Sequence, residues 1–170
     1  MHDSIIDEIK HRNINIKYPA IAIEAISKAE KELGFNIPPL LKNIYYKVGN
    51  GGFGPGYGIL GIEGGKLTGE GDTIVGHYKL MCMPDDEDTL WSWPYGLLPF
   101  CDWGCAIYSC ISCLNLPYSV LWFDPNIHEM GKSWESSFIL HRISLEDWFQ
   151  SWLNGERLFD ELKIIEDKIK

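Results

Sequence analysis

Apolar side chains recur every three or four positions in two stretches of the first fifty residues, the spacing of a helix with one buried face. The first stripe ends at Gly34, a typical residue for the end of a helix. The second follows Pro38-Pro39, which suit a first helical turn, and ends at the Gly-rich run 49–52. The apolar positions of the two stripes are Ala22, Ala25, Ile26, Ala29 and Leu33, and Leu41, Ile44, Tyr45 and Val48. A shorter helix, capped by Asp3 or Ser4, is expected before them, running to about Lys10.

The rest of the chain is read from short apolar runs between turn residues. Ser144 followed by Asp147 resembles a capping pair for a late helix, and Gly155 is expected to interrupt it before a last helical segment. Helices, then strands, then helix predict a single α+β domain over 1–170, with an antiparallel β-sheet flanked by helices. Strands are predicted near 58–62, 74–81, 106–113, 119–124 and 138–141.

The 21 residues from Trp103 to Phe123 carry no charge, which is about the length that spans a bilayer. Several Gly, Ser, Asn and Pro residues lower the hydrophobicity of this stretch, and 115–117 reads as a turn in its middle. Its flanks are Asp102 and Asp124 and not the basic residues expected at a membrane edge. We therefore expect two buried strands joined by a turn, and no membrane insertion.

The charge of the chain limits the kind of partner that it can bind. Among 170 residues, 45% are apolar and 23% are charged, and the formal net charge is −9. A negative protein is not expected to bind nucleic acid directly, because phosphates attract Lys and Arg. The charge permits a basic protein partner, although for the charge alone the preferred explanation is that acidity only keeps the protein soluble.

Four of the five cysteines lie within 13 residues, at positions 101, 105, 110 and 113. Only the last two have the two-residue separation that zinc modules favour, so small apolar core residues are the preferred interpretation over a metal site. The acidic start of the chain does not resemble a signal peptide, which predicts free thiols and a cytoplasmic protein.

Catalysis by a thiol or by paired carboxylates is the alternative function class. A nucleophilic Cys would need a base such as His77, His128 or His141, and nothing in the sequence brings one of them to a particular Cys. An acid pair would come from Asp72, Asp102 and Asp124, which also suit turns. We predict no catalytic residue and no cofactor.

Four segments of the chain carry recognisable motifs in a fixed order. They are 29–41 (Ala-Glu-Lys-Glu-Leu-Gly, then Ile-Pro-Pro-Leu-Leu), 45–54 (Tyr-Tyr-Lys-Val-Gly-Asn-Gly-Gly-Phe-Gly), 97–105 (Leu-Leu-Pro-Phe-Cys-Asp-Trp-Gly-Cys) with 123–126, and 144–156. Together these segments resemble the SUKH superfamily, the SMI/KNR-type proteins, and in particular its bacterial branch. The resemblance covers about 20–155, and the order of the segments makes it more specific than any one of them.

This resemblance implies a non-catalytic protein-binding domain, expected to be an immunity protein that neutralises a polymorphic or contact-dependent toxin, such as a basic nuclease domain. A regulatory scaffold linked to cell-wall glucan synthesis, as in the fungal relatives, is the alternative that it leaves open. The family supplies no agreed catalytic residues. Combined with charge and aromatic content, the motifs give these candidate binding residues: Asn50, Gly51, Phe53, Tyr57, Asp85, Asp86, Glu87, Asp88, Trp91, Trp93, Asp102, Trp103 and Asp124.

Overall fold

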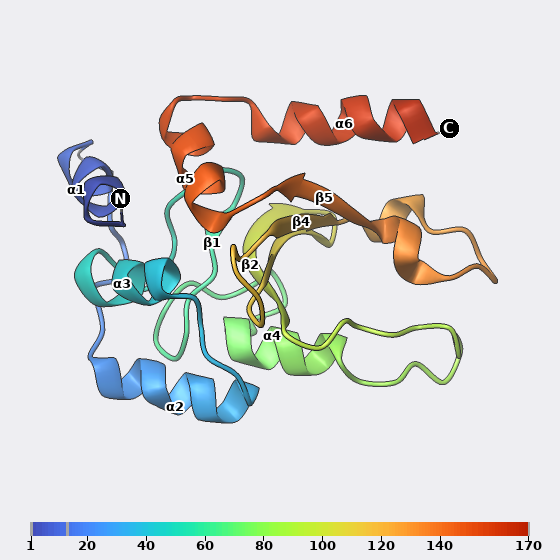
Figure 1. Ribbon diagram of the computed structural model, residues 1–170. Helices are drawn as coiled ribbons and strands as arrows, with labels where there is room; N and C mark the ends of the chain where they lie inside the picture. The colour runs from blue at the N-terminus through green and yellow to red at the C-terminus, as the bar shows by residue number, and fades with distance from the viewer. Residues whose placement is uncertain (1, 13, 170) are drawn as a thin grey trace.

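The computed structural model describes residues 2–12 and 14–169, with side chains up to residue 165. Residues 1, 13 and 170 of the predicted domain lie outside the described part. Three helices come first, a sheet with one inserted helix follows, and two helices end the chain (Figure 1). The elements are α1 (His2–His11), α2 (Ile23–Leu33), α3 (Pro39–Lys47), β1 (Gly58–Ile59), α4 (Ile74–Met81), β2 (Leu97–Gly104), β3 (Ile107–Ser112), β4 (Val120–Phe123), the 3₁₀ turns η1 (Pro125–Ile127) and η2 (Trp134–Ser137), β5 (Phe138–Arg142), α5 (Leu145–Leu153) and α6 (Leu158–Ile169).

The sheet is a meander in which each strand pairs antiparallel with the next, in the order β1-β2-β3-β4-β5. The β2–β3 hairpin turns at Cys105 and Ala106, both of which have positive φ. At this end of the sheet Tyr108 pairs with Asp102 on one side and with Phe123 on the other. The ends of β2 and β4 and the start of β3 therefore meet at one edge of the molecule.

Helices cover both faces of the sheet (Figure 1). On one face, the imidazole of His77 in α4 lies 4.6 Å from the ring of Tyr108. On the other, Trp148 of α5 packs 4.9 Å from Phe100, and Phe159 of α6 stacks 5.6 Å from Trp103. Aromatic rings thus fill both interfaces, as a chain with seven Trp and seven Phe leads one to expect.

Several predicted element ends are confirmed. Helix α2 ends at Leu33 with Gly34 in the left-handed conformation, and α3 begins at Pro39. The hydroxyl of Ser144 accepts a hydrogen bond of 3.0 Å from the backbone N–H of Asp147 at the start of α5. The predicted N-cap of α1 is wrong, because the helix already includes His2 and Asp3.

The strand predicted over 74–81 is also wrong, since this segment is helix α4. The adjacent β-branched residues Ile74 and Val75 favoured a strand. However, Thr73 caps a helix here, its hydroxyl accepting a 3.1 Å hydrogen bond from the N–H of Gly76. The buried positions Ile74, Val75, His77 and Tyr78 share one helical face against β2.

The uncharged stretch from Trp103 to Phe123 forms paired strands as predicted, with β3 against β4 and a turn at 113–119 between them. The prediction missed that the preceding run, 97–104, is itself the long strand β2, because Pro99 usually argues against a central strand. No helix in the described part of the chain has the length and hydrophobicity needed to cross a membrane.

Candidate protein-binding surface

The Asn-Gly-Gly motif holds the backbone together and lies inside the protein. Asn50 is fully buried, where its amide donates to the carbonyls of Ile62 and Glu63 and accepts from the N–H of Ile62 at 2.9 Å. Gly51 has φ of +76°, and a Cβ there would lie 2.4 Å from the carbonyl oxygen of Ile59. These two candidate binding residues have no side-chain surface to offer a partner.

Three of the candidate aromatic anchors are likewise packed inward. Phe53 is 4% exposed and Trp93 is 7% exposed. The indole of Trp93 donates a 2.7 Å hydrogen bond to the carbonyl of Leu97. Trp103 is half-buried and donates to the hydroxyl of Ser109 at 2.9 Å. Their rings stabilise the sheet and its covering helices and contribute little to the surface.

Asp102 and Asp124 close turns at the same end of the sheet. One oxygen of Asp102 accepts a 2.8 Å hydrogen bond from the N–H of Gly104, and one oxygen of Asp124 accepts from the N–H of Asn126 at 2.8 Å. Both residues are buried, at 7% and 3% exposure. The Asn126 amide also donates to the carbonyl of Cys105, which ties the two turns together.

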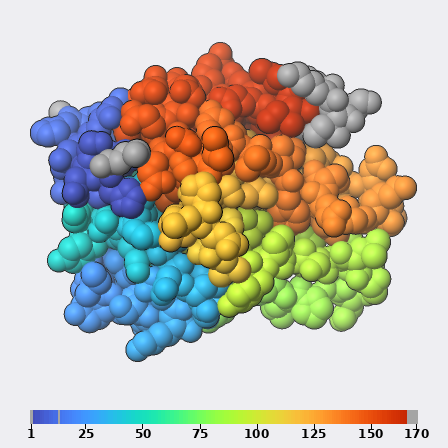
Figure 2. All heavy atoms as spheres, in the orientation of Figure 1, coloured from blue at the N-terminus to red at the C-terminus, as the bar shows by residue number. Residues whose placement is uncertain are grey.

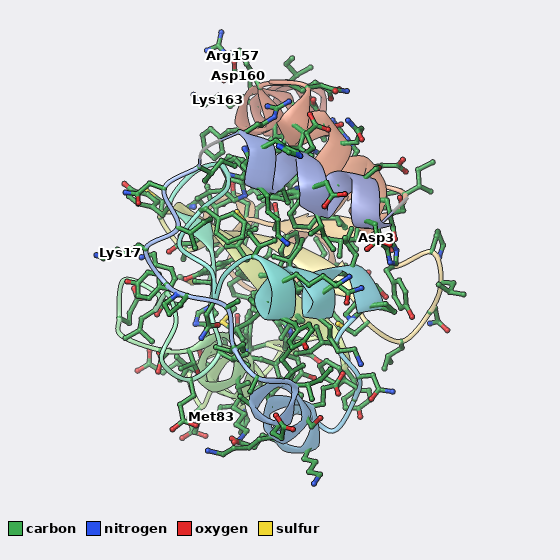
Figure 3. The ribbon with its side chains drawn as sticks, turned by 90° about the vertical axis from the view of Figure 1, so that its left-hand side faces the viewer. Asp3, Lys17, Met83, Arg157, Asp160 and Lys163 are labelled. Atoms are coloured by element: carbon green, nitrogen blue, oxygen red, sulfur yellow. The ribbon has the colours of Figure 1, made fainter. Side chains whose placement is uncertain are left out.

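The remaining candidates reach solvent. Tyr57 is 66% exposed, and the acidic loop 85–88 lies at the surface. Trp91 is half-buried, with its indole donating to the carbonyls of Met81 and Met83. Figure 3 places Met83, next to the acidic loop, on the opposite side of the molecule from Arg157 and Asp160 at the start of α6.

Two loops far apart in sequence, 82–95 and 125–137, lie against each other (Figure 2). The indole of Trp134 donates a 2.8 Å hydrogen bond to the carboxylate of Asp88. The imidazole of His128 stacks on Trp134 at 3.7 Å and lies 3.6 Å from the same carboxylate. The acidic loop is thereby held on a rigid aromatic base.

The negative charge of the chain is concentrated in one segment. Residues 67–131 contain nine carboxylates and a single Lys or Arg, Lys79, while all the other residues carry 15 acids and 14 bases. The ammonium group of Lys79 is itself paired with Glu32 at 2.9 Å. This asymmetry was readable from the sequence but was hidden in the overall net charge. We call the exposed carboxylates of this segment, at Glu70, Asp85, Asp86, Glu87 and Glu129, together the acidic surface.

A cavity of about 210 Å³ opens at the sheet end next to this surface. Its walls include Tyr57, Glu70, Asp102, Tyr108 and the backbone of the 104–106 turn. Gly104 has φ of +84°, and a Cβ there would lie 2.6 Å from the Tyr57 ring, so the ring packs directly over the turn. Burial and the nearby Asp102 and Glu70 carboxylates raise the pKa of the Tyr108 hydroxyl.

All five cysteines are free, and burial separates them into two groups. Cys101, Cys110 and Cys113 are buried, which raises the pKa of each thiol, in the case of Cys113 to about 12. Cys82 and Cys105 are exposed. Among the described residues no group of three or more His, Cys, Asp and Glu side chains is arranged to hold a metal ion, and no His bonds to a Cys.

The fold and this surface define a class of molecule: a small α+β domain with an acidic, aromatic face. The family to which the chain belongs is the SMI1 / KNR4 family (SUKH-1), whose model matches residues 20–154. The comparison with curated proteins gives no match, and neither does the comparison with solved structures. The family model covers the fold core from the loop before α2 to the end of α5.

Proposed function

We propose that this chain is an immunity protein that binds and neutralises a basic bacterial toxin domain, of which a nuclease is one example. Membership of the SMI1 / KNR4 family supports a protein-binding role. The toxin as partner is our inference. The observation that carries it is the charge asymmetry, with nine carboxylates and one base between residues 67 and 131.

The acidic surface suits a basic protein for electrostatic reasons. Opposite charges raise the rate at which two proteins meet and favour the correct orientation. Asp88 and the rings of Trp91 and Trp134 hold the loop on a fixed base, so little conformational entropy is lost on binding. A nuclease is a natural target because its active surface must itself be positive to bind phosphates.

The proposal assigns no catalytic role to any residue. The buried thiols are protonated near neutral pH because burial raises their pKa values, and a protonated thiol is a poor nucleophile. We place the protein in the cytoplasm, where free cysteines persist.

Co-expression tests this function. A toxin gene found next to the gene for this chain is expressed in bacteria with and without the chain, and growth and complex formation are measured. Protection together with co-purification is expected. A chain that neither restores growth nor binds the toxin contradicts the proposal.

A further inference from the structure

The cavity at the sheet end contains buried polar groups with bonding capacity to spare. Tyr108 is 4% exposed as a residue, and its hydroxyl, which is not fully enclosed, forms no hydrogen bond with the described residues. Asp102 is 7% exposed, and its one hydrogen bond, from the N–H of Gly104, uses only one carboxylate oxygen. Both residues line the cavity. The Tyr108 hydroxyl and the second Asp102 oxygen are not among the fully enclosed polar atoms without a partner, so both reach the open space of the cavity, where a bound group can take the place of solvent.

A second hollow, between α2 and α4, differs from the first in that its charged groups already have ion-pair partners. Its volume is about 280 Å³, and Lys28, Glu32 and Glu63 lie in its walls. There Lys28 pairs with Glu63 at 2.7 Å, and Glu32 pairs with Lys79 at 2.9 Å. By contrast, the carboxylates of Asp102 and Glu70 have no cationic partner within 4 Å among the described residues.

The lining of the sheet-end cavity selects a planar cation. Asp102 and Glu70 offer carboxylate oxygens, and the phenol oxygen of Tyr108 can accept a further hydrogen bond. The exposed Tyr57 ring forms a side wall against which a cation can stack. A guanidinium group presents five N–H donors in one plane and stacks on aromatic rings, and it fits this combination better than a compact ammonium.

We propose that this cavity receives an arginine side chain of the protein partner and so anchors the complex. The inference rests on the proposed function, which supplies the basic protein. The guanidinium bonds to Asp102 and Tyr108, stacks on Tyr57, and faces Glu70 at the mouth. Because the site adjoins the acidic surface, long-range attraction speeds association with the partner, and the cavity fixes the orientation of the bound partner.

Lys66 also lines the cavity, and its ammonium forms no ion pair with a described carboxylate. It opposes a cation through like-charge repulsion. The cavity still has a net negative charge, because Glu70 and Asp102 together outweigh this one base. Lys66 therefore provides a test of opposite sign: its removal must strengthen cation binding.

NMR titration of the intact chain with N-acetyl-arginine amide tests the inference without a partner. Shift changes are expected at the amides of Gly104, Cys105 and Ala106, with a dissociation constant on the order of millimolar. N-acetyl-citrulline amide has nearly the same shape without the charge and serves as the matched ligand control. It is expected to give no saturable change at these amides.

Three variants test the residue assignments. Asp102→Asn keeps an acceptor for the N–H of Gly104 but removes the charge, so it should weaken arginine binding about tenfold. Tyr108→Phe removes one hydroxyl and should weaken it about threefold, and Lys66→Met should strengthen it about threefold. Asp124→Asn is the matched control, because Asp124 is equally buried and accepts an equivalent turn hydrogen bond outside the cavity.

Equal responses to arginine and citrulline, or arginine shifts unchanged in Asp102→Asn, would overturn the proposed site. Failure here is separable from failure of the proposed function. If the toxin co-purifies with the chain but Asp102→Asn binds it as tightly as Asp124→Asn does, the immunity role stands and the arginine cavity does not. If the toxin does not bind at all, the immunity role falls, and the titration still decides whether the cavity accepts a guanidinium.

Discussion

Carboxylates lie close to rings in two regions of the molecule, one around Arg142 and one around Asp102. In the first region the chain itself supplies a positive side chain that pairs with the carboxylates, and in the second it does not. Beside the Trp122–His141 ring pair, the guanidinium of Arg142 bonds both oxygens of Glu161, at 2.8 and 2.9 Å. In the sheet-end cavity, Asp102 has no such partner. The protein itself therefore shows how a carboxylate binds a guanidinium of the same chain, whereas Asp102 has no such partner among the described residues.

The comparison separates stability from recognition. At Arg142 the carboxylates lower the free energy of the folded state, because the positive charge that neutralises them belongs to the same chain. Around the cavity, unpaired carboxylates add no such stabilisation and repel one another slightly. A binding surface for a positive partner requires such carboxylates, which lower the stability of the folded state but favour the complex.

Removal of the internal cation should have the largest effect on stability. Arg142→Met leaves Glu161 and Glu156 without their shared partner and is expected to lower the free energy of unfolding by about 2 kcal/mol, measured by urea denaturation. Arg157→Ala is the control, since Arg157 is highly exposed and pairs with Asp160 at the surface (Figure 3). Its expected cost is below about 0.5 kcal/mol. Equal losses in the two variants would contradict the role given to Arg142.

Two of the three buried tyrosines, Tyr45 and Tyr108, provide the next test. Tyr45 donates a 2.7 Å hydrogen bond to the carbonyl of Leu60. Tyr45→Phe should therefore cost about 1–2 kcal/mol of unfolding free energy. Tyr108→Phe should cost less than about 0.5 kcal/mol, because its hydroxyl has no partner to lose. A large loss in Tyr108→Phe would show that the hydroxyl serves the fold and not a ligand.

Acid should weaken the Arg142 region through His141. Burial, together with the charge of Arg142, lowers the pKa of His141 to about 4 and outweighs the opposing effect of Glu161. Since the unfolded chain takes up a proton near pH 6.5 and the folded chain does not, stability is fully present above that pH. It falls as the pH drops toward 4, by up to about 1.4 kcal/mol per pH unit.

His141→Gln is expected to flatten the dependence of unfolding free energy on pH between 6.5 and 4.5, as measured by urea titrations at several pH values. Below that window the lowered pKa of Glu161 makes its own contribution, which is lost as the carboxylate is protonated. Some slope remains in the variant because burial also lowers the pKa of His77. An unchanged slope in His141→Gln would contradict the assignment.

Thiol chemistry gives the smallest expected effect. Two of the five cysteines, Cys82 and Cys105, are exposed and should react quickly with a thiol reagent in the folded protein. The buried three should react only after denaturation, and the Cys82→Ser/Cys105→Ser variant should show no fast phase. Metal analysis is expected to find no zinc, and one bound equivalent would overturn the assignment of the cysteines to the core.

The sequence predicted the fold well where local signals and tertiary packing agree. Ser144 caps α5 as its spacing with Asp147 indicated, and the uncharged stretch forms two paired strands. The prediction failed at 74–81, where the strand preference of Ile74-Val75 was outweighed by the Thr73 cap and burial against the sheet.

The binding site was less accessible to sequence reasoning. Family motifs drew attention to Asn50 and Gly51, which join the loop before β1 to β1 and to the segment that follows it. The aromatic content drew attention to Trp93, which is in the core. Which of two similar aspartates lines a cavity depends on tertiary packing, so Asp102 and Asp124 could not be distinguished.

Binding of the partner by the acidic surface is tested most directly by the affinity for the toxin of the Asp86→Asn/Glu87→Gln/Glu129→Gln variant, measured at two salt concentrations. We expect at least about a tenfold loss of affinity, and a weaker salt dependence than for the unaltered chain. Neutralising three exposed carboxylates elsewhere, in the Asp7→Asn/Glu24→Gln/Asp147→Asn variant, should change affinity less than about threefold. Equal losses in the two variants would contradict binding by the acidic surface.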